Sequence, residues 1–186
     1  MSVILDHVAL LVRDLDACAA RPELAGLARG EIDEFPAEGT RELYVDAPAD
    51  AAPGGARLLL MQALGEVGPY ARALARRGPG LHHLALRVSS FDDFLGGLQG
   101  WLLHPASLRT REHGALWLAR PGVSTLVEVC EGPPDPPRGP VRGLEVAADA
   151  PLRGLLAGLG CAGLAGGEAT RLRLLGDPFD PVAFGR

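Results

Sequence analysis

The sequence predicts an α+β fold built from two copies of a strand–helix–three-strand unit, followed by a shortened third unit. The first observation is an internal repeat: residues 6–12 (DHVALLV) match residues 82–88 (HHLALRV), an offset of 82 − 6 = 76 residues. The second is that further strand-like segments recur in the same order after each match. We therefore expect paired βαβββ modules at residues 1–64 and 80–131, forming one domain over residues 1–131.

The elements of the first module follow from local patterns. Residues 6–12 are apolar and partly β-branched, which indicates a strand. Asp14 can accept the free N–H groups of a first helical turn, so a helix is expected over Ala17 to Ala28. Strands are then expected at residues 42–48 and 57–62, the first of them ending at a proline turn.

The second module repeats this order. A strand at residues 82–88 is followed by Ser90, a helix start, and by a helix expected over Phe94 to Leu102. Residues 115–121 resemble residues 42–48, and residues 126–131 resemble residues 57–62. Both segments of the second module are therefore predicted to be strands.

A basic helix is predicted between the modules, over residues 70–77, and Gly78-Pro79-Gly80 closes it. Its arginines, Arg72, Arg76 and Arg77, could bind a phosphate or could form a solvated cationic helix end.

The remaining chain consists of a linker and a shortened module. Residues 132–140 are rich in proline and predict a stiff linker. Residues 141–186 predict a degenerate third module with a helix over Ala150 to Leu159. Gly143 stands where the first two modules carry His7 and His83, so this module cannot supply that side chain. We expect it to serve as cover or as an interface.

Equivalent positions of the two full modules predict a metal site. Their first strands present His7 and His83, and their last strands present Leu59 and Glu128. If the modules pair with pseudo-twofold symmetry, these side chains converge. Two imidazoles and one carboxylate suit divalent Fe, Mn, Co, Ni or Zn, whereas Leu59 cannot bind a metal.

Each candidate ligand also has a structural interpretation. A single buried histidine such as His7 is usually a hydrogen-bonded core residue. Glu128 lies within an apolar strand, and burying an unpaired carboxylate there would cost several kcal/mol, which favours a ligand role. By the period-two rule His82 points to the opposite face from His83, so we expect it to be structural.

Three segments resemble the vicinal oxygen chelate superfamily, and most closely the methylmalonyl-CoA epimerases and their relatives: residues 5–16 (LDHVALLVRDLD), residues 80–86 (GLHHLAL) and residues 126–128 (LVE). The resemblance covers about residues 3 to 131 and implies a half-open sheet that forms a cleft around a divalent metal. It assigns the metal ligands to His7, His83 and Glu128. Leu59 stands where the epimerases and glyoxalase I usually have Glu or Gln.

The resemblance also implies a catalytic base. The epimerases carry a glutamate on the corresponding element of the first module, and Glu42 aligns with it. A carboxylate here could equally lie on the outer face of the strand. The related extradiol dioxygenases carry an acid–base histidine that has no clear match here, and His113 is named as a candidate for it.

Three functions remain open. The first is a metal-dependent lyase or isomerase of the glyoxalase and epimerase type, which stabilises an enolate or oxyanion of a carbonyl or acyl-thioester substrate. The second is an Fe(II) extradiol-type dioxygenase that uses the same triad and leaves the Leu59 position empty. The third is a metal-free protein that binds small molecules.

Composition limits the partners and the compartment. The chain of 186 residues has a net charge of −5, which makes nucleic acid and anionic membranes poor partners, and all its cations are arginine. Without lysine, Schiff-base and P-loop chemistry are excluded. Cys18, Cys130 and Cys161 form no CxxC pair and are expected to be reduced. The first residues lack a signal-peptide pattern, so we expect a cytoplasmic protein with a small-molecule substrate. Superfamily modules pair within or between chains, which allows a homodimer.

Overall fold

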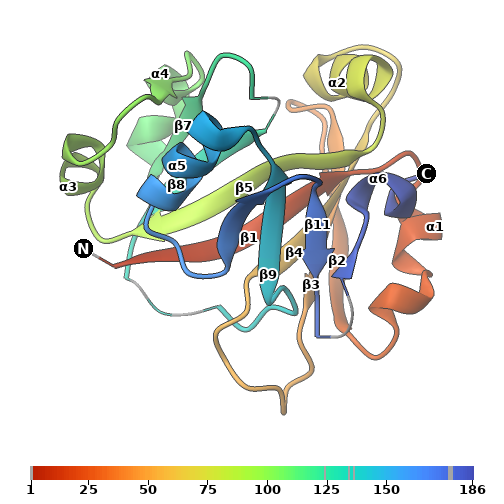
Figure 1. Ribbon diagram of the computed structural model, residues 1–186. Helices are drawn as coiled ribbons and strands as arrows, with labels where there is room; N and C mark the ends of the chain where they lie inside the picture. Colours follow the sequence, from red (N-terminus) through yellow and green to blue (C-terminus); the bar gives the residue numbers. More distant parts are fainter. Residues whose placement is uncertain (1, 124, 134, 136, 176–177) are drawn as a thin grey trace.

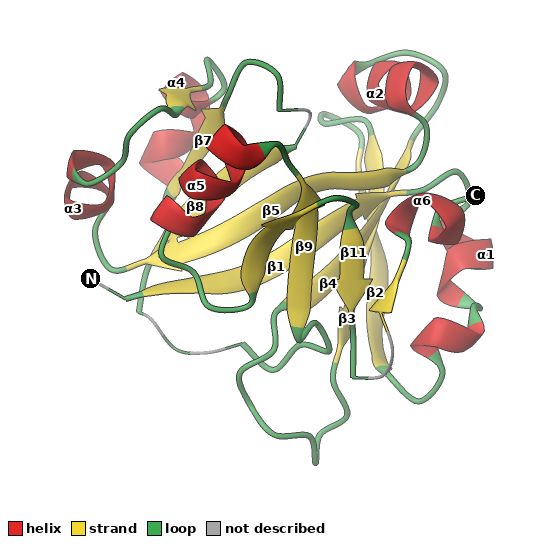
Figure 2. Ribbon diagram, in the orientation of Figure 1, coloured by secondary structure: helices red, strands yellow, loops and turns green. Residues whose placement is uncertain are grey.

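The computed structural model describes residues 2–123, 125–133, 135, 137–175 and 178–186. Its strands form two sheets, one of eight strands and one of four, with helices at their margins (Figures 1 and 2). The α+β class predicted from the sequence is confirmed. None of the helices in the described part of the chain has the length and apolar composition needed to cross a membrane.

The eight-stranded sheet is made of the two repeated units. The first contains β1 (Val3–Leu11), α1 (Leu15–Ala19), a 3-10 turn (Pro22–Leu24), β2 (Ala28–Phe35), β3 (Thr40–Asp46) and β4 (Arg57–Ala63). After α2 (Pro69–Arg77), the second contains β5 (Gly80–Val88), α3 (Phe91–Gly96), β6 (Leu102–Leu103), α4 (Ser107–Thr110), a 3-10 turn (Arg111–His113), β7 (Ala115–Ala119) and β8 (Leu126–Glu131).

The strand order shows the symmetry of the pair. It runs β2-β3-β4-β1-β5-β8-β7-β6, so β1 and β5 lie side by side in the middle and are antiparallel. Each is flanked by the last strand of its own unit in parallel orientation, β4 beside β1 and β8 beside β5. The two βαβββ units are therefore related by a pseudo-twofold axis between the central strands.

The first helix of each unit begins as expected and ends earlier. The Asp14 carboxylate accepts the N–H of Ala17, and the Ser90 hydroxyl accepts the N–H of Asp93. Helix α1 stops at Ala19 and does not reach Ala28, because Pro22 lacks a backbone N–H and Gly26 has a φ of 76°. The helix expected to end at Leu102 spans Phe91–Gly96 and ends where two glycines follow each other.

The C-terminal unit follows the Pro-rich segment. It contains β9 (Gly143–Ala147), α5 (Ala150–Gly158), β10 (Leu164–Gly167), β11 (Arg171–Arg173), β12 (Pro178–Phe179) and α6 (Pro181–Phe184). Its strand order is β10-β9-β11-β12, so β9 pairs in parallel with the first strand after its helix. In the two modules, the parallel neighbour of the first strand is the last strand. The unit therefore shares the element order of a module and differs in strand order.

The predicted linker is attached to the first module. Pro134 and Pro136 lie outside the described residues. The N–H of Gly139 donates to the carbonyl of Gly55, and Ala56 and Val141 exchange both backbone hydrogen bonds. The described end of the segment is thus held against the loop between β3 and β4.

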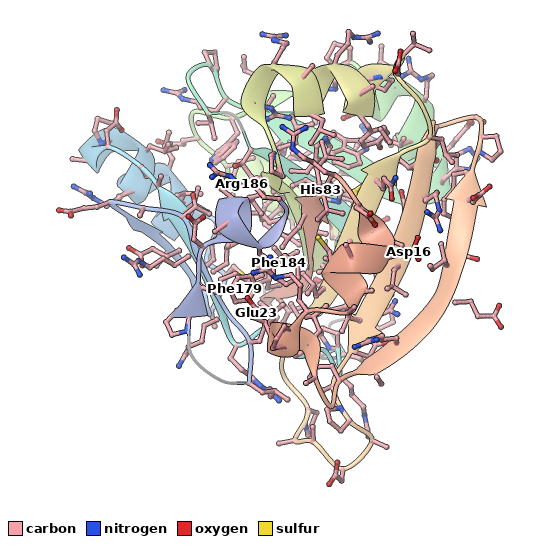
Figure 3. The ribbon with its side chains drawn as sticks, turned by 90° about the vertical axis from the view of Figure 1, so that its right-hand side faces the viewer. Asp16, Glu23, His83, Phe179, Phe184 and Arg186 are labelled. Carbon is pink, nitrogen blue, oxygen red and sulfur yellow. The ribbon has the colours of Figure 1, made fainter. Side chains whose placement is uncertain are left out.

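The main core lies on one face of the large sheet. Val8 and Leu10 of β1 point into it together with Leu84 of β5, and the C-terminal unit adds Leu144 and Phe184 to the same cluster. In Figure 1, β9 and β11 cross in front of the large sheet. Figure 3 shows Phe184 beside Phe179, and their ring centroids are 5.0 Å apart. The C-terminal unit therefore covers this face and leaves the opposite face, which carries His7 and His83, for the candidate site.

Candidate metal centre

The strand register places the predicted ligands on one face in two rows. His7 is paired with Ala85, and Ala85 with Glu128. In the second row, His83 is paired with Ala9, and Ala9 with Leu59. Paired residues of neighbouring strands share a face, so all of these side chains project to the same side. The pseudo-twofold axis exchanges the two rows, and Leu59 is the counterpart of Glu128.

Two alanines make room at the centre of this arrangement. Ala9 and Ala85 are fully buried, and each lies between two larger side chains of its row. With only a methyl group at these positions, the side chains of the neighbouring strands can meet above them. The alanines thus form the floor of the site.

The structure brings the three predicted ligands together. The Nε2 atoms of His7 and His83 are 3.2 Å apart. The Glu128 Oε2 atom lies 3.4 Å from His7 Nε2 and 3.7 Å from His83 Nε2. Both histidines are buried, and Glu128 is partly exposed. The site therefore has two deep imidazoles and one carboxylate at its entrance.

These separations fit a single divalent ion. Donor atoms bound at about 2.1 Å lie about 3.0 Å apart at a 90° angle and about 3.4 Å apart at a tetrahedral angle. The three observed distances lie close to this range. His7, His83 and Glu128 form the only group of three or more potential ligands found among the described residues. Two imidazoles and a carboxylate suit Fe, Mn, Co, Ni or Zn.

A bulge in β1 brings a carboxylate to His7. The register steps from Leu5 directly to His7, so Asp6 has no paired residue on β5. The Asp6 Oδ2 atom accepts from His7 Nδ1 at 3.0 Å, and Oδ1 accepts from Arg87 Nε at 2.7 Å. Burial alone would lower the pKa of His7, but its hydrogen bonds with Asp6 and Glu128 outweigh burial and raise it. His7 Nδ1–H is thereby fixed on Asp6, and Nε2 faces the other ligands.

A second bulge corrects the prediction for His82. The register steps from His83 directly to Leu81, so the alternation of faces is interrupted at His82. Its Nδ1 atom lies 2.9 Å from His83 Nδ1 and its ring 5.2 Å from the ring of Tyr70. The prediction that His82 points away from His83 is therefore wrong. It assumed an uninterrupted period of two.

Two aromatic rings flank the ligands. Tyr44 packs edge-on against His7, with ring centroids 5.8 Å apart, and Trp117 packs edge-on against His83 at 5.0 Å. Tyr44 is paired with Leu59, and Trp117 with Glu128, so the rings are also counterparts in the two units. They restrict the rotation of the imidazoles. The matching strands in the sequence predicted their equivalence but not their contacts with the histidines.

The fourth position of the site is apolar. Leu59 is 3% exposed and packs with Ala9, Leu11 and Met61. Ala73 and Leu74 of α2 contact this cluster, and Figure 3 shows His83 below α2 in that view. The Leu59 side therefore offers hydrophobic contact, and a metal held by His7, His83 and Glu128 would find no fourth protein ligand there.

Glu42 lies on the same face of the sheet as the ligands. It is paired with Met61, two residues along β3 from Tyr44, and its Oε1 accepts from the Thr40 hydroxyl at 2.9 Å. Burial raises the pKa of Glu42, and the negative charge of Glu38 adds to the effect. The alternative, a strand carboxylate on the outer face, does not match this placement.

The other candidates lie elsewhere. Arg72, Arg76 and Arg77 of α2 line an open groove of about 450 Å³. His113 is highly exposed beside Glu112. The three cysteines are free: Cys18 and Cys161 are buried, and Cys130 is partly buried. Sequence reasoning missed Asp6 and Arg87 because only the bulge turns Asp6 toward Arg87.

Comparison with known proteins identifies the fold. No protein-family model matches the sequence, and no curated protein matches it. Among solved structures, a selenomethionine-labelled methylmalonyl-CoA epimerase has a TM-score of 0.50 and 23% identity, covering 70% of this chain and 95% of that chain. The chain therefore shares the fold of this epimerase, which is the fold that the resemblance to the vicinal oxygen chelate superfamily implied. Methylmalonyl-CoA epimerase from Mycobacterium tuberculosis has a TM-score of 0.47, 26% identity, and covers 69% of this chain and 87% of that one. A hypothetical protein from Bacillus halodurans C-125 has a TM-score of 0.49, 20% identity, and covers 72% and 96%.

Proposed function

We propose that this protein is a divalent-metal-dependent enzyme that stabilises an enolate or similar oxyanion of a carbonyl or acyl-thioester substrate. The observation that carries the proposal is the cluster of His7 Nε2, His83 Nε2 and Glu128 Oε2, with distances of 3.2–3.7 Å. A metal bound there supplies a Lewis acid for the substrate oxygen. His7, His83 and Glu128 hold it, and the apolar side at Leu59 excludes water from one flank.

Glu42 is the proposed base in this reaction. A carboxylate with a raised pKa is a stronger proton acceptor than an exposed one, as long as it remains ionised. Thr40 donates to Oε1 and holds the side chain, which leaves Oε2 to remove the proton α to the carbonyl. Proton removal by Glu42 of β3 and oxyanion stabilisation by the metal held on β1, β5 and β8 then act on the same substrate from one face of the sheet.

The test measures, by NMR, the exchange of the α-proton of a malonyl-type acyl thioester for deuterium in D2O. The protein is loaded in turn with Mn, Co, Ni, Zn or Fe(II). The wild type should exchange the proton with at least one of these ions. Glu42→Gln should lower the rate by at least about a hundredfold with unchanged metal affinity. Glu31→Gln, a change on the exposed strand β2, is the control. Full exchange by Glu42→Gln, or no exchange by the wild type with any ion, would contradict the proposal.

One observation favours a second candidate, an Fe(II) dioxygenase of the extradiol type. With Leu59 at the fourth position, the chain offers a His, His, Glu triad that leaves room for a chelating substrate and O2. Oxygen uptake on addition of a catechol to the Fe(II)-loaded protein, with ring-cleaved product, would select this function. A purified chain that binds none of the five ions would instead select a metal-free binding protein.

A further inference from the structure

The two ligand histidines share a feature that the metal alone does not require. Each is preceded in the sequence by a residue at a β-bulge, Asp6 before His7 and His82 before His83. In a regular strand, the side chains of consecutive residues point to opposite faces, so one cannot hydrogen-bond to the imidazole of the next. A bulge adds one residue and re-aims its side chain. Here both bulges turn the preceding side chain back toward the histidine.

Each bulged residue contacts the Nδ1 atom of the histidine that follows it. Asp6 Oδ2 lies 3.0 Å from His7 Nδ1, and His82 Nδ1 lies 2.9 Å from His83 Nδ1. All four residues are buried, with exposed fractions of 8% or less. Since the partner occupies Nδ1 in each case, Nε2 is the atom that remains for the ion. The two contacts are therefore equivalent under the pseudo-twofold axis.

The chemistry of the two partners differs. Asp6 is a carboxylate, held in turn by Arg87 through Nε and Nη2. His82 can accept the Nδ1–H of His83 only as a neutral imidazole. The His82 ring is buried and packs against the ring of Tyr70, with centroids 5.2 Å apart. A carboxylate makes the imidazole bound to it a stronger electron donor than a neutral acceptor does.

We propose that Asp6 and His82 are positioning residues that hold His7 and His83 as Nε2 ligands, and that Asp6 makes His7 the stronger ligand of the two. The inference rests on the proposed metal site. It adds that both histidines are Nδ1–H tautomers and that they differ in strength as ligands. Arg87 fixes Asp6 in the bulge. Neither positioning residue touches substrate or metal.

The test uses the full chain and two readouts. Co2+ affinity is measured by titration, and the tautomer of His83 in the metal-free protein is read from its 15N ring shifts by NMR. Asp6→Leu should weaken Co2+ binding by about 10- to 100-fold, and Asp6→Asn, which still accepts from Nδ1–H, should restore part of that loss. His82→Phe keeps a ring against Tyr70 and should convert His83 from a single Nδ1–H tautomer to a mixture, with a smaller loss of affinity than Asp6→Leu.

Asp92→Asn is the matched control, because Asp92 is an exposed carboxylate on α3. It should change neither readout. Wild-type Co2+ affinity in both Asp6→Leu and His82→Phe would overturn the positioning roles. A His83 tautomer unchanged in His82→Phe would overturn the role of His82 even if affinity falls. If the wild type binds no Co2+ while His83 is the Nδ1–H tautomer, the proposed function fails and the positioning of His83 stands.

Discussion

Leu59 is the counterpart of Glu128 across the pseudo-twofold axis, so Leu59→Glu places a fourth ligand opposite the first carboxylate. Without metal, the change removes a buried apolar side chain whose burial stabilises the fold by about 1.5–3 kcal/mol. It also buries a carboxylate beside Ala9, Leu11 and Met61, which adds a cost of a similar size or larger. We expect a loss of about 3–6 kcal/mol, or a drop in Tm of roughly 6–24 °C for a chain of this size.

With metal, the new carboxylate gains a partner, which offsets part of this cost. We expect Leu59→Glu to bind Mn2+ or Co2+ at least about tenfold more tightly than the wild type, which corresponds to about 1.4 kcal/mol. Thermal unfolding with and without metal and a competition titration measure both effects. Leu59→Met, which conserves volume without adding a hard ligand, is the control. If Leu59→Glu has wild-type affinity and is equally destabilised with and without metal, Leu59 does not reach the site and the two-row arrangement is wrong.

Two further predictions concern the floor of the site and the C-terminal unit. Ala85→Leu should abolish Co2+ binding, because the larger side chain would fill the space over Ala85 in which His7 and Glu128 meet. Ala85→Ser should retain binding. If the two variants bind Co2+ with equal affinity, a small residue at this position is not required. Phe184→Ala should lower the free energy of unfolding by about 3–5 kcal/mol, with a single transition in urea, because Phe184 is 1% exposed within the common core. A separate early transition would show that the C-terminal unit unfolds alone.

The repeated strands could be predicted because the apolar residues of their buried faces recur in the sequence. Segments such as residues 82–88 are apolar and recur after 76 residues. Strand β2 was harder to locate, since all eight of its residues are exposed and it lies at the edge of the sheet. No apolar alternation therefore marks it. The helix expected over Ala17 to Ala28 is longer than α1 because the cap at Asp14 marks only its start, whereas Pro22 and Gly26 end it.

The candidate ligands could be predicted from the equivalence of the modules, which placed His7, His83 and Glu128 in corresponding strands. Their hydrogen-bonded partners could not. A bulge is a shift between two strands and leaves no clear mark in one of them, so His82 was assigned to the wrong face. Arg87 gave no signal either, because its partner Asp6 is 81 residues away and is turned toward it only by the other bulge.

Metal stoichiometry in the wild type and in His83→Ala tests the account most directly. The purified wild type, loaded with Co2+ and desalted, should retain one ion per chain by elemental analysis, and His83→Ala should retain none while keeping a wild-type circular dichroism spectrum. His113→Ala, which removes an exposed histidine, should retain one. Full occupancy in folded His83→Ala would show that the two imidazoles and the carboxylate do not form the metal site.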